Sequence, residues 1–149
     1  MNTQGTIRID PVTLAAGEEV GEVEVVIPYA DPALTRAVLA RSAALTAGLH
    51  VRISLIAVHT VPYPSDFVCP TATHSFLVGR LVELSADCPL PVSPQVVLAR
   101  TREDGFRHAL RAESTVLVGT RRSVWRTAEE RLARSLAADG HKVVLVHVE

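Results

Sequence analysis

Three arginines lie close together in residues 116–135, which read VLVGTRRSVWRTAEERLARS. Arg121, Arg122 and Arg126 follow an apolar run that ends at Gly119. A guanidinium keeps its positive charge and carries a planar fork of N–H donors, which suits it to phosphate and carboxylate groups. A strand, a glycine, a polar loop and a helix start, in this order, form the phosphate site of many α/β proteins. The stretch is therefore a candidate anion site.

The same stretch contains groups that oppose a phosphate. Thr127 and Glu130 match the S/T-x-x-E capping box, in which the side chains satisfy the free N–H groups of their own helix. Glu129 and Glu130 also place negative charge at the positive end of the helix dipole, where a triphosphate would bind. Two alternatives remain open: the arginine side chains hold an anion without a glycine cradle, or the site has no ordinary affinity for nucleotides.

Other side chains of interest are aromatic or titratable. Trp125 lies between the arginines; it could stack on a ligand, but we expect it to cover the loop against the last helix. Pro28 and Tyr29 end an apolar run and are expected to line the same cleft. His59 is expected to be structural, because no carboxylate or nucleophile is found near it by spacing.

The sequence contains no recognisable enzyme motif. It lacks a glycine-lysine phosphate loop and a G-x-S-x-G elbow. Cys69, His74 and Cys88 lack the close paired spacing of zinc ligands. We therefore expect neither catalysis nor a metal centre.

The elements that position these residues follow from the hydrophobic pattern. Five apolar segments of strand length alternate with four amphipathic segments. Strands are expected at 23–30, 51–61, 94–100, 114–120 and 142–148, and helices at 32–48, 73–86, 102–113 and 127–140. This alternation predicts an α/β fold with a single, doubly wound parallel sheet and helices on both faces. Ligands of such sheets bind beyond the carboxyl ends of the strands, where the strand order reverses.

The helix starts and inward faces can also be predicted. Asp31 followed by Pro32 is a strong start, since the carboxylate accepts a free N–H and proline has none to satisfy. The side chains expected to face the core are Leu34, Val38 and Leu45 on the first helix, Phe76, Leu77, Leu81 and Leu84 on the second, Phe106, Ala109 and Leu110 on the third, and Leu132, Ala133 and Leu136 on the fourth.

Composition limits the class of protein. The chain of 149 residues is 48% hydrophobic and 21% charged, which predicts a packed core. A net charge of −1 gives no reason to expect a nucleic acid partner. The start lacks a basic and apolar leader, and no apolar run approaches the ~18 residues of a membrane span, so we expect a cytoplasmic protein without membrane insertion. Residues 1–22 are expected to form an N-terminal arm or edge strand beside a domain of residues 23–149.

The order of several motifs resembles the universal stress protein family, part of a larger superfamily of adenine-nucleotide α/β folds. VVIPYADPALTRAVLARSAALTAG resembles the first strand and helix of the family, and LIAVHTVP its second strand. AESTVLVGT resembles the segment before its glycine loop, and KVVLVHV its final strand. The four stretches together span about residues 23–148.

The resemblance implies a sheet order of 3-2-1-4-5 and a homodimer that pairs through the final strand, Val143–Val148. It also implies a nucleotide site for ATP or AMP, of weak affinity here. The residues at the matching positions are Pro28, Tyr29, Ala30, Asp31, His59, Val61, Gly119, Thr120, Arg121, Arg122, Arg126 and Thr127.

The sequence departs from the ATP-binding members in three places. Arg122 stands where the second loop glycine is found, and Thr127 or Glu130 lies near the position of a later Gly-Ser pair. In the family an aspartate ends the first strand, and its position aligns with Ala30 of this sequence. Asp31 comes one position later than that aspartate. We therefore expect a divergent member of the family, a dimeric regulatory or interaction module in stress response with a degenerate nucleotide site. A nucleotide or anion binder using the arginine loop, and a cytoplasmic domain fused to a transporter, are the alternatives.

Overall fold

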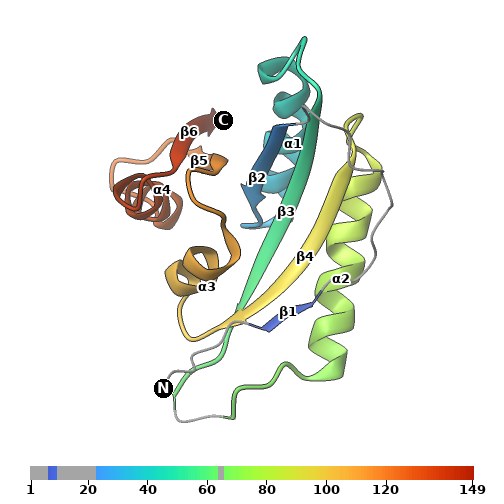
Figure 1. Cartoon of the computed structure of the whole chain (residues 1–149), viewed down its shortest axis with the longest axis vertical. Coiled ribbons are helices and arrows are strands. Elements are labelled where there is room, and N and C mark those ends of the chain that lie inside the picture. Colours follow the sequence, from blue (N-terminus) through green and yellow to red (C-terminus); the bar gives the residue numbers. More distant parts are fainter. Residues whose placement is uncertain (1–6, 10–22, 64–65) are drawn as a thin grey trace.

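The computed structural model describes residues 7–9, 23–63 and 66–149, and shows one six-stranded sheet (Figure 1). The strand order is β1-β4-β3-β2-β5-β6. Its strands are β1 (Ile7–Ile9), β2 (Val23–Pro28), β3 (Val51–Thr60), β4 (Val92–Ala99), β5 (Thr115–Arg121) and β6 (Lys142–Val148). The helices are α1 (Pro32–Leu45), α2 (Thr71–Ala86), α3 (Arg102–Ala109) and α4 (Ala128–Ala138).

The five strands from β2 to β6 run parallel and confirm the predicted α/β class and the order 3-2-1-4-5. β1 is added antiparallel to β4, at one edge of the sheet. The rest of the expected N-terminal arm, residues 1–6 and 10–22, lies outside the described residues. None of the helices in the described part of the chain is long and apolar enough to cross a membrane.

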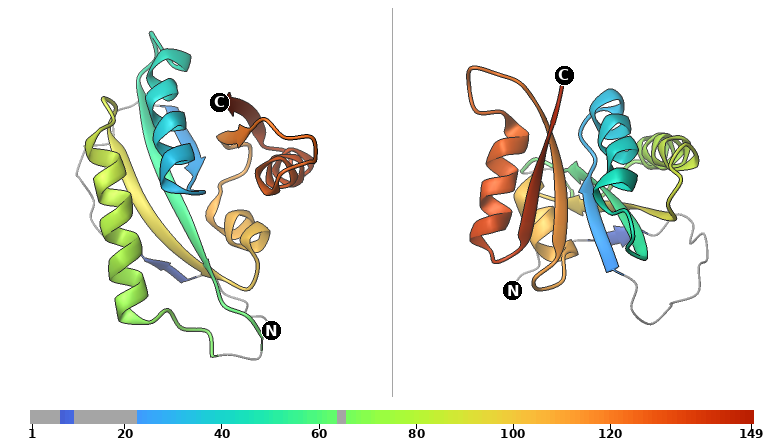
Figure 2. Two further views of the ribbon diagram at one scale, coloured as in Figure 1. Left: turned by 180° about the vertical axis from the view of Figure 1, so that it is seen from behind. Right: turned by 90° about the horizontal axis from the view of Figure 1, so that it is seen from above.

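Successive side chains of the central strands enter two separate cores. On β2, Val25 and Ile27 join one cluster of buried residues, whereas Val26 joins the other. This follows from the two-residue period of a strand and explains why β2 is apolar at consecutive positions. Helices α1 and α2 cover the first face of the sheet, and α3 and α4 cover the second (Figure 2).

The helices begin at the side chains that the sequence indicates. Asp31 Oδ1 accepts a hydrogen bond from the N–H of Leu34 at 2.8 Å, with proline at the first position of α1. Thr127 Oγ1 accepts from the N–H of Glu130 at 3.1 Å and caps α4. Each cap satisfies one of the N–H groups that a first helical turn leaves free. These two predicted helix starts are confirmed.

Two of the residues expected in the core are exposed instead. Leu45 is 50% exposed. The buried face of α1 repeats every four residues, at Val38, Ser42 and Thr46, and Leu45 lies beside this face. Phe76 is 62% exposed, since it lies one position off the stripe of α2 that buries Leu81 and Leu84. The Phe76 ring instead lies under the guanidinium of Arg80, 5.4 Å from its carbon. The predictions for both side chains were wrong.

The two central strands separate toward their carboxyl ends. β2 pairs with β5 through Val25–Thr115 and Val26–Val116, whereas β5 stays paired with β6 as far as Arg121–Val148. The chain turns to opposite sides of the sheet after β2 and after β5, so this is where the strand order reverses. Beyond these two pairs, β2 and β5 are no longer paired through their backbones, and contacts between their carboxyl ends are made by side chains.

Gly119 lies within β5 and allows α1 to pack directly on that strand. A Cβ at Gly119 would lie 2.3 Å from Cγ2 of Val38 and 3.2 Å from Cδ1 of Leu34. Such a distance is shorter than van der Waals contact, so any larger residue would push α1 away. Packing against the helix is therefore sufficient to explain the glycine.

Candidate functional site

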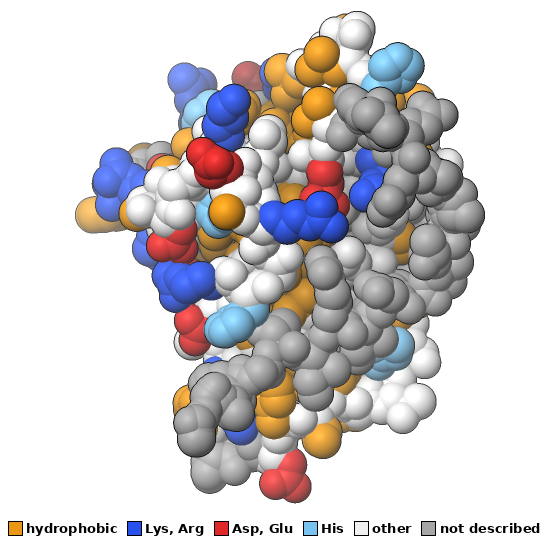
Figure 3. Space-filling model, in the orientation of Figure 1, with side chains coloured by type: hydrophobic (Ala, Val, Ile, Leu, Met, Phe, Trp, Pro, Cys, Tyr) orange, Lys and Arg blue, Asp and Glu red, His pale blue; other side chains and the backbone are white. Residues whose placement is uncertain are grey.

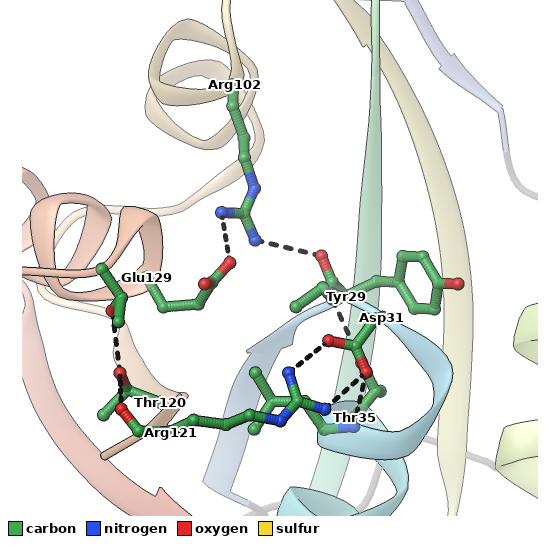
Figure 4. Close-up of polar contacts among 10 residues, drawn as sticks. Tyr29, Asp31, Thr35, Arg102, Thr120, Arg121 and Glu129 are labelled. Atoms are coloured by element: carbon green, nitrogen blue, oxygen red, sulfur yellow. Dashed lines mark hydrogen bonds and ion pairs between the residues drawn. The ribbon is translucent and has the colours of Figure 1, made fainter. Parts of the chain in front are cut away.

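Asp31 and Arg121 form a bidentate ion pair across the strand-order reversal (Figure 4). Asp31 follows β2, and Arg121 is the last residue of β5. The two terminal nitrogens of Arg121 donate to Oδ2 and Oδ1 of Asp31 at 2.7 and 2.9 Å. This parallel arrangement is the preferred geometry between a guanidinium and a carboxylate. The pair ties the first strand–helix turn of the parallel sheet to the end of β5.

The carboxylate of Asp31 has two simultaneous functions, because it also caps α1. The hydrogen bonds from Arg121, with a smaller contribution from the Leu34 N–H, lower the pKa of Asp31 from 3.8 to about 2. The same hydrogen bonds raise the pKa of Arg121 above its ordinary value. Both side chains are about half exposed, so solvent weakens the attraction between them. Asp31 nevertheless remains ionised at neutral pH.

Arg102 makes a second bridge over the same gap, from the start of α3. One of its terminal nitrogens donates to the carbonyl oxygen of Tyr29 at 3.1 Å, and the other contacts Glu129 Oε2 at 3.0 Å. Both charged side chains are mostly buried, with 25% and 21% exposed. Glu129 therefore already has a cationic partner. Figure 4 shows the Tyr29 ring directed away from this bridge, and its burial raises the pKa of the phenol.

The hydroxyl groups of Thr120 and Thr127 close the base of the loop between β5 and α4. Their oxygens lie 2.8 Å apart, and Thr120 is fully buried. Thr127 also caps α4, so its oxygen is engaged both by Thr120 and by the Glu130 N–H. This confirms the threonine half of the predicted capping box. One of the N–H groups that a phosphate could use at this helix start is thus already satisfied.

The loop itself carries the remaining cationic groups. Arg122 and Arg126 are exposed, and neither takes part in an ion pair between described residues. The expectation that Trp125 covers the loop against α4 is wrong, because Trp125 is 81% exposed.

An open groove lies beside the ion pair, at the carboxyl ends of β5 and β6. Its volume is about 710 Å³. It is lined by Arg41, Arg121, Arg122, Ser123, Glu130, His147, Val148 and Glu149. Arg41 comes from α1 and donates a hydrogen bond to the carbonyl oxygen of His147 at 3.0 Å. Three guanidinium groups therefore line one groove, one from α1 and two from consecutive residues at the end of β5, together with the carboxylates of Glu130 and Glu149.

The structure brings together most of the residues expected at a nucleotide site. Pro28 ends β2 and is buried, and the Ala30 N–H donates to Thr35 Oγ1 at 3.1 Å in the turn that follows. Tyr29, Asp31, Thr120 and Arg121 surround the strand-order reversal (Figure 4). Thr127 lies beside Thr120, to which its hydroxyl group is hydrogen-bonded. His59 and Val61 lie farther along, beyond the β3 residue that pairs with Pro28. Their roles in binding stay predictions.

Arg102, Glu129 and Arg41 contribute to this region, and the sequence reasoning did not assign them. Arg102 meets Tyr29 from 73 positions away, and Arg41 meets His147 from 106 positions away. The Thr101 cap that starts α3 could have indicated where Arg102 begins its helix. Nothing local in the sequence indicates which carbonyl or carboxylate each guanidinium reaches. Among described residues, no three His, Cys, Asp or Glu side chains converge as metal ligands would.

Comparison with solved structures places the chain beside a universal stress protein from Archaeoglobus fulgidus. The superposition has a TM-score of 0.53 and 10% sequence identity, and it covers 83% of this chain and 92% of the other. The similarity establishes a universal-stress-protein-like fold. Comparisons with protein-family models and with curated protein sequences give no match.

Proposed function

We propose that the protein is a universal-stress-protein-like regulatory or interaction module, without catalytic activity, whose nucleotide site is degenerate. The observation that carries the proposal is the double bridge at the strand-order reversal. Two ion pairs, Asp31–Arg121 and Arg102–Glu129, lie where a doubly wound sheet is expected to bind its ligand. The charged groups at this position are therefore already paired with each other. The fold is shared with a universal stress protein, and the function is our inference from the site.

A triphosphate at this position would have to compete with existing contacts. Arg121 would have to exchange the Asp31 carboxylate for a phosphate, which would leave Asp31 without its cation. Glu129 and Glu130 lie in the first turn of α4, and the cap already engages the Glu130 N–H. Anions bind at helix starts because free N–H groups point outward. Here the helix start offers carboxylates instead, which supports low affinity for ATP.

Thermal unfolding with and without Mg-ATP or AMP tests this proposal. A ligand present at 100 times its Kd stabilises the folded state by about 2.7 kcal/mol. We expect no shift of the unfolding temperature at millimolar nucleotide. A saturable stabilisation of that size, lost in Arg121→Ala, would contradict the degenerate site.

We also propose that the module is a homodimer that pairs through β6. This strand forms one edge of the sheet, and it exposes 44% of Val144 and 40% of Leu145. An edge strand with exposed apolar side chains and free backbone groups readily pairs with another strand. Protein partners that use the same edge would compete with the dimer. Sedimentation as a monomer at micromolar concentration would count against this arrangement.

The groove supports a second candidate function, the binding of a small anion or nucleotide by arginine side chains. Arg41, Arg121 and Arg122 line it together, and Arg122 has no ion pair within the described chain. Asp31→Ala would release Arg121 and should strengthen binding of inorganic phosphate or AMP. Arg121→Ala/Arg122→Ala should abolish binding, and calorimetry measures both. Equal affinity in wild type and both variants would exclude this candidate.

A further inference from the structure

We propose that the tip of the loop between β5 and α4 is a contact site for an anionic lipid surface. In this arrangement Val124 and Trp125 enter the interface between headgroups and acyl chains, while Arg122 and Arg126 bind lipid phosphates. The inference goes beyond the proposed function, because it concerns a lipid partner at the tip of the loop, although Arg122 also lines the groove. It describes a contact at the membrane surface and no membrane-spanning segment.

Two adjacent apolar side chains project from the loop almost entirely into solvent. Val124 is 94% exposed and Trp125 is 81% exposed, the two highest values among the exposed large hydrophobic residues. The loop extends at the left margin of Figure 1, where Figure 3 shows hydrophobic and basic side chains next to each other. Exposed tryptophan and valine lose the free energy of apolar burial while the protein is alone in water. Such a cost is commonly offset by an interaction partner.

The base of this loop is held in place on both sides. The ion pair with Asp31 fixes Arg121, and the hydroxyl contact between Thr120 and Thr127 joins the two ends of the loop. At the tip, Ser123 Oγ accepts a hydrogen bond from the N–H of Trp125 at 3.2 Å. A serine turn of this kind reverses the backbone locally. These contacts restrict the conformations of the loop before binding, which reduces the entropic cost of docking.

Guanidinium groups gather around the tip, and several of them have no ion-pair partner among the described residues. None of the ion pairs between described residues involves Arg122, Arg126, Arg131 or Arg134. Arg131 lies against the loop, because its guanidinium donates to the carbonyl oxygen of Arg126 at 3.1 Å. The carboxylates of Asp31 and Glu129 are engaged by Arg121 and Arg102. Glu130 remains, and it lines the same groove as Arg122, so Arg126 is the loop arginine outside that groove.

The shape and composition of the tip favour a lipid surface over a folded protein. Val124 and Trp125 project into solvent and do not line the adjacent groove, and a lipid interface accepts such a protrusion without shape complementarity. Tryptophan is enriched at membrane interfaces, where an apolar ring and a polar N–H are both satisfied. Each arginine near an anionic surface adds about fivefold to the partition coefficient. Apolar insertion and basic contacts are the two signals that stable peripheral attachment requires.

Intrinsic fluorescence tests the proposal directly, because Trp125 is the single tryptophan of the chain. The full chain is titrated with vesicles of phosphatidylcholine alone and of phosphatidylcholine with phosphatidylserine. We expect a blue shift of the emission and cosedimentation with the anionic vesicles, both weakened by salt. An emission maximum typical of a buried indole in the lipid-free protein would overturn the proposal.

Variants of the loop separate its two contributions. Arg122→Glu/Arg126→Glu keeps the fluorophore, and its partition coefficient should fall roughly 25-fold or more. Val124→Ser/Trp125→Ala should abolish cosedimentation. Leu49→Ala and Arg111→Glu are matched controls, since both residues are exposed and precede their strands at the opposite end of the sheet. Both controls should bind vesicles as the wild type does, and thermal unfolding should show all variants folded.

Several results would contradict a lipid site. Equal cosedimentation of wild type and Val124→Ser/Trp125→Ala would show that the apolar side chains of the tip do not contribute to vesicle binding. Equal binding to neutral and anionic vesicles would show that the arginines do not bind lipid phosphates. A blue shift with a polyglutamate peptide, together with no binding to anionic vesicles, would assign the loop to an acidic protein partner and overturn the proposal.

Discussion

Asp31 and Arg121 are 90 positions apart in the sequence, yet two hydrogen bonds of 2.9 and 2.7 Å join their side chains. The pair connects the first helix start of the parallel sheet to the end of β5, where the strand order reverses. Open α/β sheets bind their ligands at such a point. In this protein the same position carries a salt bridge between two of its own side chains.

Substitution of Asp31 should separate its capping function from its ion pair. Asp31→Ala removes both and should lower the free energy of unfolding by about 1 kcal/mol or more, the usual cost of a lost helix cap. Asp31→Asn keeps a capping oxygen and should cost less. Urea unfolding followed by circular dichroism measures both variants. Equal losses in the two variants would show that the cap contributes nothing.

The stability contributed by the Asp31 carboxylate should depend on acid pH. Its pKa is about 2 in the folded protein and 3.8 ordinarily, so the folded state favours the ionised form. The contribution is therefore complete above about pH 4 and is lost as the pH falls toward 2. The difference in unfolding free energy between wild type and Asp31→Asn should shrink over this interval. A difference that stays constant from pH 6 to pH 2 would contradict the pairing.

Replacement of Gly119 should test whether it serves packing. The added Cβ of Gly119→Ala would overlap Val38, so α1 must shift, and we expect a loss of about 1–3 kcal/mol in unfolding free energy. Gly119→Ala/Val38→Ala removes the overlapping methyl groups and should cost less than the sum of the single variants. Additive losses would argue against the contact.

A second glycine provides the matched control for this experiment. Gly79 lies in α2, and a Cβ there would have no neighbour within 4 Å. Gly79→Ala should therefore stabilise the protein by about 0.5–1 kcal/mol, because alanine has the higher helix propensity. Opposite signs for the two glycines are the expected outcome. Destabilisation at both positions would indicate that the effect at Gly119 is not specific.

The proposed dimer predicts a change of mass when the β6 edge becomes charged. Leu145→Glu places a carboxylate on a side chain that is 40% exposed at that edge, and it should convert the dimer to a monomer. Leu49→Glu, in the turn before β3, should leave the mass unchanged. Analytical ultracentrifugation at micromolar concentration measures both. A dimer that persists in Leu145→Glu would exclude pairing through this strand.

Local patterns predict much of the fold. The apolar runs, the Asp31 and Thr127 caps and the inward faces of α3 and α4 could be predicted from neighbouring residues. The sheet order came from the resemblance to the universal stress protein family. The N-terminal strand beside β4 was harder to assess, because three residues carry little pattern. The faces of α1 and α2 were misjudged at Leu45 and Phe76, where a shift of one position moves a side chain from core to solvent.

The sequence alone determined most of the secondary structure, the parallel α/β architecture and the presence of arginines directly after Gly119. These properties depend on residues near one another in the chain. The tertiary structure decided that Asp31 receives Arg121, that Arg102 bridges Tyr29 and Glu129, and that Trp125 stays exposed. These outcomes depend on how far β2 and β5 separate and on which side chains then span the gap. Such distances are set by the packing of α1 on Gly119 and of α3 and α4 on the opposite face, and no local pattern encodes them.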